Sequence, residues 1–160
     1  MGGTPDVLAR VQPQAGTSYP VLVPNVKGLD DFLAFRSSNP DLTAFDEIAI
    51  FTAATDAFSR ANTNCTVAES LARLAPVAQR ATEAGLRVRG YVSVVVACPY
   101  TGRVEPTDVA RVAKALDEMG CYEISLGDTV GQGTPDSVRT MIDAVSREVP
   151  VAKLAGHVGS

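Results

Sequence analysis

The sequence is poor in the residues that build metal clusters and disulfide frameworks. Its 160 residues include a single histidine, His157, and three cysteines. The cysteines are odd in number, widely spaced and without a CxxC pair, which gives little support to a disulfide framework or a zinc knuckle. A reducing compartment fits this cysteine usage best, and one histidine does not make a metal site by itself.

Signals for membranes and nucleic acids are also missing. No apolar run is long enough to cross a bilayer, and residues 1–16 carry neither an apolar segment of signal length nor an Arg-rich amphipathic helix. The formal net charge is −4, and the basic residues are scattered without an aromatic–basic cluster. We therefore expect neither a nucleic acid nor a membrane as a partner.

The remaining composition is ordinary for one soluble domain. Hydrophobic residues make up 46% of the chain and charged residues 20%, which is enough apolar side chain for a real core. Residues 1–18 are rich in Gly, Pro and Gln, and we expect an irregular N-terminal lead there. A single domain is predicted over residues 19–160.

Strand-like runs alternate with amphipathic helices along this domain. The capping-box spacing of Thr66 and Glu69 predicts the clearest helix start, and Pro76 is a candidate kink inside that helix. The expected strands are 19–25, 47–54, 86–99, 121–127 and 151–158, and the expected helices are 27–35, 66–85, 106–120 and 134–150. Strands and helices that alternate at intervals of about thirty residues indicate βαβ crossovers, hence a parallel sheet with helices outside it.

The strands carry a polar face, which distinguishes a barrel from a doubly wound sheet. In "RVRGYVS", Arg89 and Tyr91 share one face, opposite Val88 and Val92. The run "YEISLG" repeats this alternation, with Glu123 on the polar side. A parallel sheet covered by helices on both sides should read as near-continuous apolar runs, so a repeated polar face suggests a lumen lined for a ligand.

The predicted fold class is therefore α/β, with a partial (β/α) TIM-type barrel of about five parallel strands and outer helices. Five strands cannot close an eight-stranded barrel. Arg89 and Glu123 are expected to project into one polar lumen. The apolar residues of the same strands, Val88, Val92, Ile124 and Leu126, are expected to pack beneath the helices.

Two groups of polar residues are candidates for the site. Asp128 and Thr129 follow a buried strand, where barrel enzymes place site residues, although the same aspartate could simply satisfy the amides of a glycine-rich turn. Arg89, Tyr91 and Glu123 could line a pocket, or could form an internal ion pair that never touches a substrate. The local sequence leaves both alternatives open.

Three further positions have weaker local support. His157 ends the fifth strand, where it could bind a metal, transfer a proton or form a hydrogen bond at the strand terminus. Asn62 lies in "ANTNCT", which reads equally well as turn and cap chemistry or as a ligand contact. Cys98 and Cys121 are interpreted as small buried hydrophobes, because no basic neighbour is visible that would lower a thiol pKa.

Four long motifs together resemble the 3-hydroxy-3-methylglutaryl-CoA lyase family, which has a metal-dependent (β/α)8 barrel. They are "YPVLVPNVKG", "ANTNCTVAESLARL", "RVRGYVSVVVACPYTGRVEP" and "MGCYEISLGDTVGQGTP", and they occur in order at the family's spacing from about Tyr19 to His157. The resemblance implies cleavage of an acyl-CoA to acetyl-CoA and acetoacetate with Mg²⁺ or Mn²⁺. It also implies a mitochondrial or bacterial cytoplasmic location, between which this sequence does not choose.

The resemblance assigns roles to individual residues. His157 is similar to the first histidine of the family's metal-binding His-x-His motif, and Asp128 to its strand-end acidic residue, with Arg89 as a second catalytic position. Thr129 is similar to a neighbouring substrate contact. The other positions that would line the same pocket are Asn62, Tyr91 and Glu123.

Two family features have no counterpart in this chain. No "RDG" motif occurs, and Gly159 stands where the second metal-binding histidine belongs. We therefore expect a truncated or partial lyase that is inactive alone. The alternative is a non-catalytic partial barrel that acts as an interaction or assembly module and self-associates through its open sheet edges.

Overall fold

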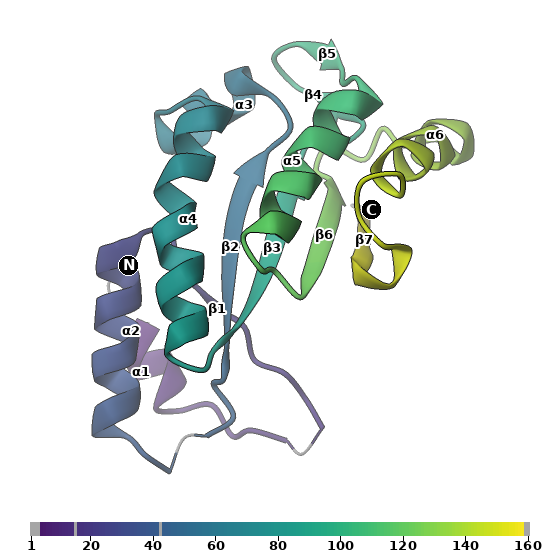
Figure 1. Ribbon diagram of the computed structural model, residues 1–160. Helices are drawn as coiled ribbons and strands as arrows, with labels where there is room; N and C mark the ends of the chain where they lie inside the picture. The colour runs from purple at the N-terminus through teal and green to yellow at the C-terminus, as the bar shows by residue number, and fades with distance from the viewer. Residues whose placement is uncertain (1–3, 15, 42, 159–160) are drawn as a thin grey trace.

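The protein, a computed structural model, is described over residues 4–14, 16–41 and 43–158. Five parallel strands form one sheet in the order β1-β2-β3-β6-β7 (Figure 1). Their bounds are Val21–Leu22 (β1), Glu47–Ala53 (β2), Arg87–Ser93 (β3), Glu123–Asp128 (β6) and Leu154–Val158 (β7). The predicted α/β class with about five parallel strands is confirmed.

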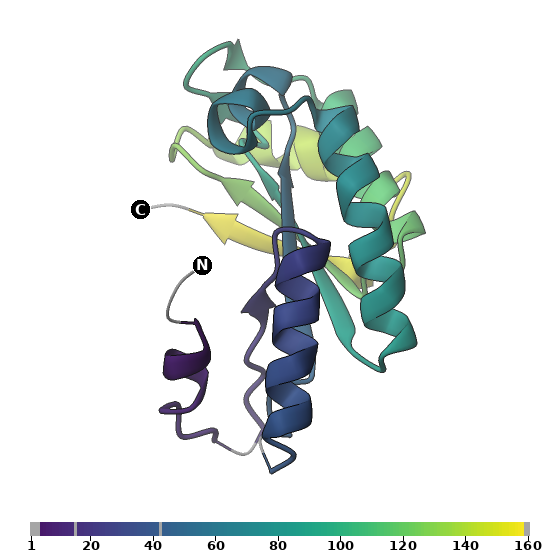
Figure 2. The ribbon, with the colours of Figure 1, turned by 90° about the vertical axis from the view of Figure 1, so that its left-hand side faces the viewer.

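Helices connect these strands. They are α1 (Thr4–Leu8), α2 (Val26–Ser38), α3 (Asp56–Thr63), α4 (Val67–Glu83), α5 (Pro106–Glu118) and α6 (Pro135–Val145), with a 3₁₀ turn at Val151–Lys153 before β7. Figure 2 shows α2 and α4 along the same side of the sheet, while α1 lies apart from them near the N-terminus. In the described residues no helix is both long and apolar enough to span a membrane.

The local sequence explains where the helices begin. The predicted capping box of α4 is present, since the Thr66 hydroxyl accepts from the Glu69 amide while Glu69 accepts from the Thr66 amide. Pro106 occupies the first turn of α5, where its missing N–H costs no helical hydrogen bond. The predicted kink at Pro76 does not divide α4, which remains one helix through this residue.

One face of the sheet packs against the helices and makes the core. We call it the helix face, and its strand residues are Ile48, Ile50, Val88, Gly90, Val92, Ile124 and Leu126. A Cβ atom at Gly90 would lie 3.1 Å from Leu116 of α5 and 3.2 Å from Cys121, so the missing side chain lets α5 approach β3 closely. The predicted packing of Val88, Val92, Ile124 and Leu126 beneath the helices is confirmed.

Three local features differ from the sequence-based expectations. The lead was expected to be irregular, yet it contains α1, whose Leu8 joins the core. Helix α3 was not predicted. The strand expected over 86–99 ends at Ser93, and an antiparallel hairpin of β4 (Ala97–Cys98) and β5 (Gly102–Arg103) follows it. The domain boundary at residue 19 stays a prediction.

Candidate active site

The second face of the sheet carries the polar residues. In a parallel pair, facing residues point to the same side, so the register of β3 and β6 places Arg89 beside Glu123 and Tyr91 beside Ser125. We call this side the polar face. Besides Glu47 and Arg87 at the amino ends of the strands, its polar members are Arg89, Tyr91, Ser93, Glu123, Ser125 and His157. The predicted phase of both strands is therefore correct.

A hydrogen-bonded triad forms the centre of the polar face. Arg89 donates from Nε to Glu123 Oε1 at 2.6 Å and from Nη1 to the Tyr91 hydroxyl oxygen at 2.7 Å. Burial lowers the pKa of Arg89, but Tyr91 and Glu123 together raise that pKa above its ordinary value. The guanidinium therefore stays charged and is held in one orientation by two neighbours.

A second ionic group lies at the amino ends of the strands, and sequence reasoning missed it. Glu47 is 1% exposed and accepts a hydrogen bond from the Tyr122 hydroxyl at 2.8 Å. Arg87 lies 2.9 Å from the other Glu47 oxygen and 4.9 Å from the centroid of the Tyr122 ring. Burial and the bond to Glu47 raise the pKa of Tyr122 to about 12. The sequence did contain a signal for this group, because Arg87 lies two residues before Arg89 and therefore on the same face of the strand.

The carboxyl ends of the strands form a rim, which lies two side-chain layers above Arg89 and Glu123 and one layer above Tyr91. His157 faces Gly127 in the register of β6 and β7, and the Ser93 Cα lies 4.0 Å from where a Gly127 Cβ would stand. Gly127 thus places no side chain between Ser93 and His157. The rim lies about 13 Å along the strand from Glu123, at about 3.3 Å per residue. Ser93 follows Tyr91 on the polar face and belongs to this rim, although it was not among the predicted site residues.

Asp128 is bound to the loop that leads into α6. Its carboxylate is buried and accepts from the amides of Gln132 at 3.2 Å and Gly133 at 2.7 Å. A Cβ at Gly133 would stand 2.7 Å from Asp128 Oδ2, so the glycine is needed for this contact. These bonds agree with the turn-amide alternative, and the catalytic role predicted for Asp128 stays a prediction.

Thr129 also has backbone partners. Its hydroxyl oxygen accepts from the Val94 amide at 2.9 Å and lies 3.4 Å from the Gly127 carbonyl oxygen. Val94 has a φ of 57°, which is a left-handed conformation that β-branched residues rarely adopt. The predicted substrate contact of Thr129 therefore stands beside an observed contact with strained backbone.

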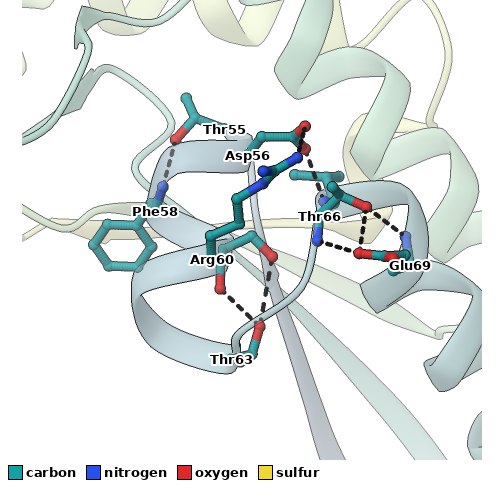
Figure 3. Close-up of polar contacts among 9 residues, drawn as sticks. Thr55, Asp56, Phe58, Arg60, Thr63, Thr66 and Glu69 are labelled. Atoms are coloured by element: carbon teal, nitrogen blue, oxygen red, sulfur yellow. Dashed lines mark hydrogen bonds and ion pairs between the residues drawn. The ribbon is translucent and has the colours of Figure 1, made fainter.

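Asn62 is exposed on α3. Figure 3 shows the polar contacts that cap α3 and α4. Thr55 caps α3, Thr66 caps α4, and Asp56 accepts from the Val67 amide at 2.8 Å. The cap interpretation of "NTNCT" accounts for Thr66, the N-cap of α4, and for Asn64, the left-handed C-cap of α3. It does not assign a partner to Asn62, whose predicted substrate role stays a prediction.

Cys98 is buried in the hydrophobic core, as predicted, but its thiol also has polar partners that the sequence did not reveal. Burial raises its pKa, but hydrogen bonds from the Thr101 and Thr55 side chains and from the amides of Tyr100 and Thr101 outweigh burial and lower the pKa to about 7. Thr55 Oγ1 lies 3.2 Å from the sulfur. By contrast, burial raises the pKa of Cys121 to about 12.

The described residues do not make a site for the divalent cation that the resemblance implies. Across residues 4–14, 16–41 and 43–158, no group of three His, Cys, Asp or Glu side chains comes close enough to hold a metal ion. His157 is exposed on the rim and is the one predicted metal ligand of this chain. Gly159, where the family carries its second histidine, lies outside the described residues.

A family model described as HMGL-like matches residues 6–158. The chain is 48% identical over 157 residues to a hydroxymethylglutaryl-CoA lyase of Pseudomonas mevalonii and 49% identical over 152 residues to the mitochondrial hydroxymethylglutaryl-CoA lyase of Rattus norvegicus. These matches cover 98% and 95% of this chain but 50% and 44% of the relatives. The chain thus spans about half the length of the curated relatives it matches.

Solved structures agree with these matches. The HMG-CoA lyase of Brucella melitensis superposes with a TM-score of 0.90 at 47% identity, covering 99% of this chain and 53% of that one. The hydroxymethylglutaryl-CoA lyase of Pseudomonas aeruginosa gives a TM-score of 0.88 at 45% identity, with 99% and 50% coverage. The predicted partial TIM-type barrel is confirmed by these neighbours.

Proposed function

Because the chain belongs to the HMGL-like family, we propose that it supplies the middle part of an active site that cleaves 3-hydroxy-3-methylglutaryl-CoA. The observation that carries this proposal is the Arg89–Tyr91–Glu123 triad on the polar face of the parallel sheet. Relatives of 45–49% identity over nearly the whole chain are named as lyases of this substrate, which supports the same chemistry here.

The reaction is a retro-aldol cleavage of a carbon–carbon bond. Removal of the hydroxyl proton lets the oxygen form the ketone of acetoacetate, while the broken bond leaves its electron pair on the acetyl thioester as an enolate. A proton then completes acetyl-CoA. Groups fixed in advance where negative charge develops lower the barrier to such a step.

We propose different roles for the residues at the rim of the polar face and for those below it. Arg89, oriented by Glu123 and Tyr91, is proposed as a cationic floor that attracts the acyl end of the substrate. Ser93 and His157 are proposed as rim groups, with His157 able to accept a proton or to act as one ligand of a cation. Asp128 is proposed to hold the loop between β6 and α6 in shape through the amides of Gln132 and Gly133.

The proposed cation is Mg²⁺ or Mn²⁺, by resemblance to the family, and the acyl-CoA substrate is proposed on the same ground. His157 would contribute one ligand, and other parts of a longer protein would contribute the rest. A mitochondrial or cytoplasmic location is proposed likewise, and the mammalian relatives are named as mitochondrial.

A second candidate function is self-assembly. Strands β1 and β7 are the outermost strands of the sheet order, and a parallel edge with unpaired backbone groups can add another strand. This candidate predicts that the purified chain self-associates. Light scattering tests it, and a monodisperse monomer with a cooperative, high-temperature melt would contradict it.

A chimera tests the proposed function directly. Residues 6–158 replace the matched segment of the Pseudomonas mevalonii lyase, and acetoacetate release is measured with excess Mg²⁺ or Mn²⁺. We expect metal-dependent turnover by the chimera and none by the isolated chain. Circular dichroism checks that the chimera folds, and the unaltered Pseudomonas enzyme is the positive control.

Two results would contradict the proposal. A folded chimera without turnover would show that these residues do not serve the lyase reaction. If the chimera with residues 6–158 does not fold, the test is repeated with a shorter graft of residues 87–128, which still contains the whole triad. If instead the isolated chain cleaves the substrate and His157→Ala abolishes this turnover, then the chain is sufficient for the reaction without the remaining parts of a longer lyase.

A further inference from the structure

The end of β3 contains a bulge that the regular sheet does not explain. The register pairs Val92 with Leu126, and its continuation would put the Val94 amide on the Gly127 carbonyl. Instead the Val95 amide donates to the Gly127 carbonyl at 3.1 Å. Val94, which directly follows the last residue of β3, is therefore one extra residue in the backbone, and its amide is displaced from the continuation of the ladder.

The extra residue is strained and completely enclosed. Val94 is 0% exposed, and its φ of 57° places a β-branched side chain in the left-handed region. Such a conformation persists only where the surrounding structure determines it. A buried amide that has lost its ladder partner also needs another acceptor.

The Thr129 hydroxyl supplies that acceptor. Its oxygen accepts from the Val94 amide at 2.9 Å and lies 3.4 Å from the Gly127 carbonyl, which itself receives the Val95 amide. One side chain from the end of β6 thus closes the bulge on the neighbouring strand. Thr129 is the predicted site residue whose side chain accepts the Val94 amide.

The bulge sets the direction of the chain on both sides. Ser93 precedes it at the rim, and its carbonyl oxygen accepts from the Ala54 amide at 3.0 Å. After the bulge, Val95 and Val96 line a cavity of about 430 Å³ between the β4–β5 hairpin and α6. Bulges at barrel rims commonly redirect side chains next to active sites.

We propose that Thr129 is a positioning residue: its hydroxyl holds the left-handed bulge at Val94 and thereby fixes Ser93 at the rim of the candidate active site. The catalytic half of this statement rests on the proposed function. The structural half does not, because it concerns hydrogen bonds within the isolated chain.

Amide exchange in the isolated chain tests the structural half. Thr129→Val removes the acceptor with little change of shape, and Thr129→Ser keeps it. We expect hydrogen exchange of the Val94 amide, followed by NMR, to accelerate at least about tenfold in Thr129→Val and to change less than about threefold in Thr129→Ser. Equal exchange in all three proteins would overturn the proposal, whether or not the chimera is active.

Kinetics of the chimera test the catalytic half. A positioning role predicts that Thr129→Val lowers kcat at least about tenfold with KM within about twofold, and that Thr129→Ser retains most of kcat. A large rise in KM at unchanged kcat would indicate a direct substrate contact and overturn the proposal. An inactive chimera would overturn the proposed function together with this half, while the exchange result stands independently.

A matched pair of double variants separates positioning from substrate contact. Val94→Gly and Val94→Ala both remove the buried branched side chain, but only glycine adopts the left-handed conformation without strain. In the Thr129→Val background we expect the glycine variant to have at least about fivefold higher kcat than the alanine variant. Equal kcat in the two double variants would contradict the proposal.

Discussion

At the centre of β3 and β6, neighbouring side chains on the two faces of the sheet differ in how completely they are enclosed. On the helix face, Ile124 and Val88 are 0% and 1% exposed. On the polar face, the neighbouring side chains of Arg89 and Glu123 in the same strands remain 26% and 31% exposed. Residues that are only about 3.3 Å apart along one strand thus lie in two different environments, the buried core and the partly exposed polar face.

This difference separates the residues that stabilise the sheet from those available for chemistry. Buried apolar side chains contribute through the area they remove from water and through close packing. The polar face instead contains charges whose positions are fixed by mutual hydrogen bonds. We therefore expect substitutions on the helix face to change mainly stability, and those on the polar face to change function together with a smaller loss of stability.

The largest expected effect is on the helix face. Ile124→Ala should lower the free energy of unfolding by about 2–5 kcal/mol, because it leaves a cavity in the core between the sheet and its covering helices. Urea unfolding followed by circular dichroism measures this loss. Ser125→Ala, the next residue on the opposite face, is the matched control, and a loss as large as that of Ile124→Ala would break the comparison.

The Arg89–Glu123 pair should give a smaller effect. Removing either partner is expected to cost about 1–2 kcal/mol, at the lower end for hydrogen bonds to charged groups because both side chains are partly exposed. A double-mutant cycle of Arg89→Met and Glu123→Gln measures their coupling. Additive losses in this cycle would show that the pair is not energetically coupled.

The helix caps contribute stability to the layer that covers the helix face. Thr66→Ala removes the capping oxygen of α4 and should cost about 1 kcal/mol. Thr66→Ser keeps the oxygen and serves as the control. The midpoints of thermal unfolding distinguish the two, and equal midpoints would show that the capping box adds nothing to the folded state.

A pH effect at Cys98 should be the smallest of these changes. Its folded pKa of about 7 lies below the ordinary value of 9.0, so the folded protein releases the thiol proton first and stability rises with pH between 7 and 9. This contribution is lost as pH falls through 7. The expected gain from pH 7 to 8 is on the order of 1 kcal/mol at most.

Urea unfolding at pH 6, 7 and 8 measures this gain, with Cys98→Ala as the control that should abolish it. Cys121 does not interfere in this window, because its raised pKa affects stability only above its ordinary value of 9.0. An identical pH dependence in the Cys98→Ala variant would contradict the assignment to this thiol.

The alternation of polar and apolar residues was enough to predict the sheet and its two faces. Period-two patterns report which side a residue takes, and the pairs Val88–Arg89 and Glu123–Ile124 were placed correctly. The triad could also be anticipated from this phase. Local patterns contain this information because each strand must bury one side by itself.

Features that depend on distant partners could not be predicted in the same way. The low pKa of Cys98 arises partly from Thr55, which is 43 residues away in the sequence. The bulge at Val94 depends on Thr129, which is 35 residues away. Helix α3 was missed because it has only 8 residues, and half of them are Asp, Ser, Asn or Thr, which also favour turns and caps.

The central claim is that neighbouring residues of β3 have separate roles, and one pair of substitutions tests it most directly. Val88→Ala and Arg89→Met are introduced singly into the chimera, and both the free energy of unfolding and the rate of acetoacetate release are measured. We predict that Val88→Ala lowers stability by about 1–3 kcal/mol with an unchanged rate per folded molecule, in line with large-to-small core substitutions. Arg89→Met should lower that rate at least about tenfold. Equal rates in the two variants would contradict the account.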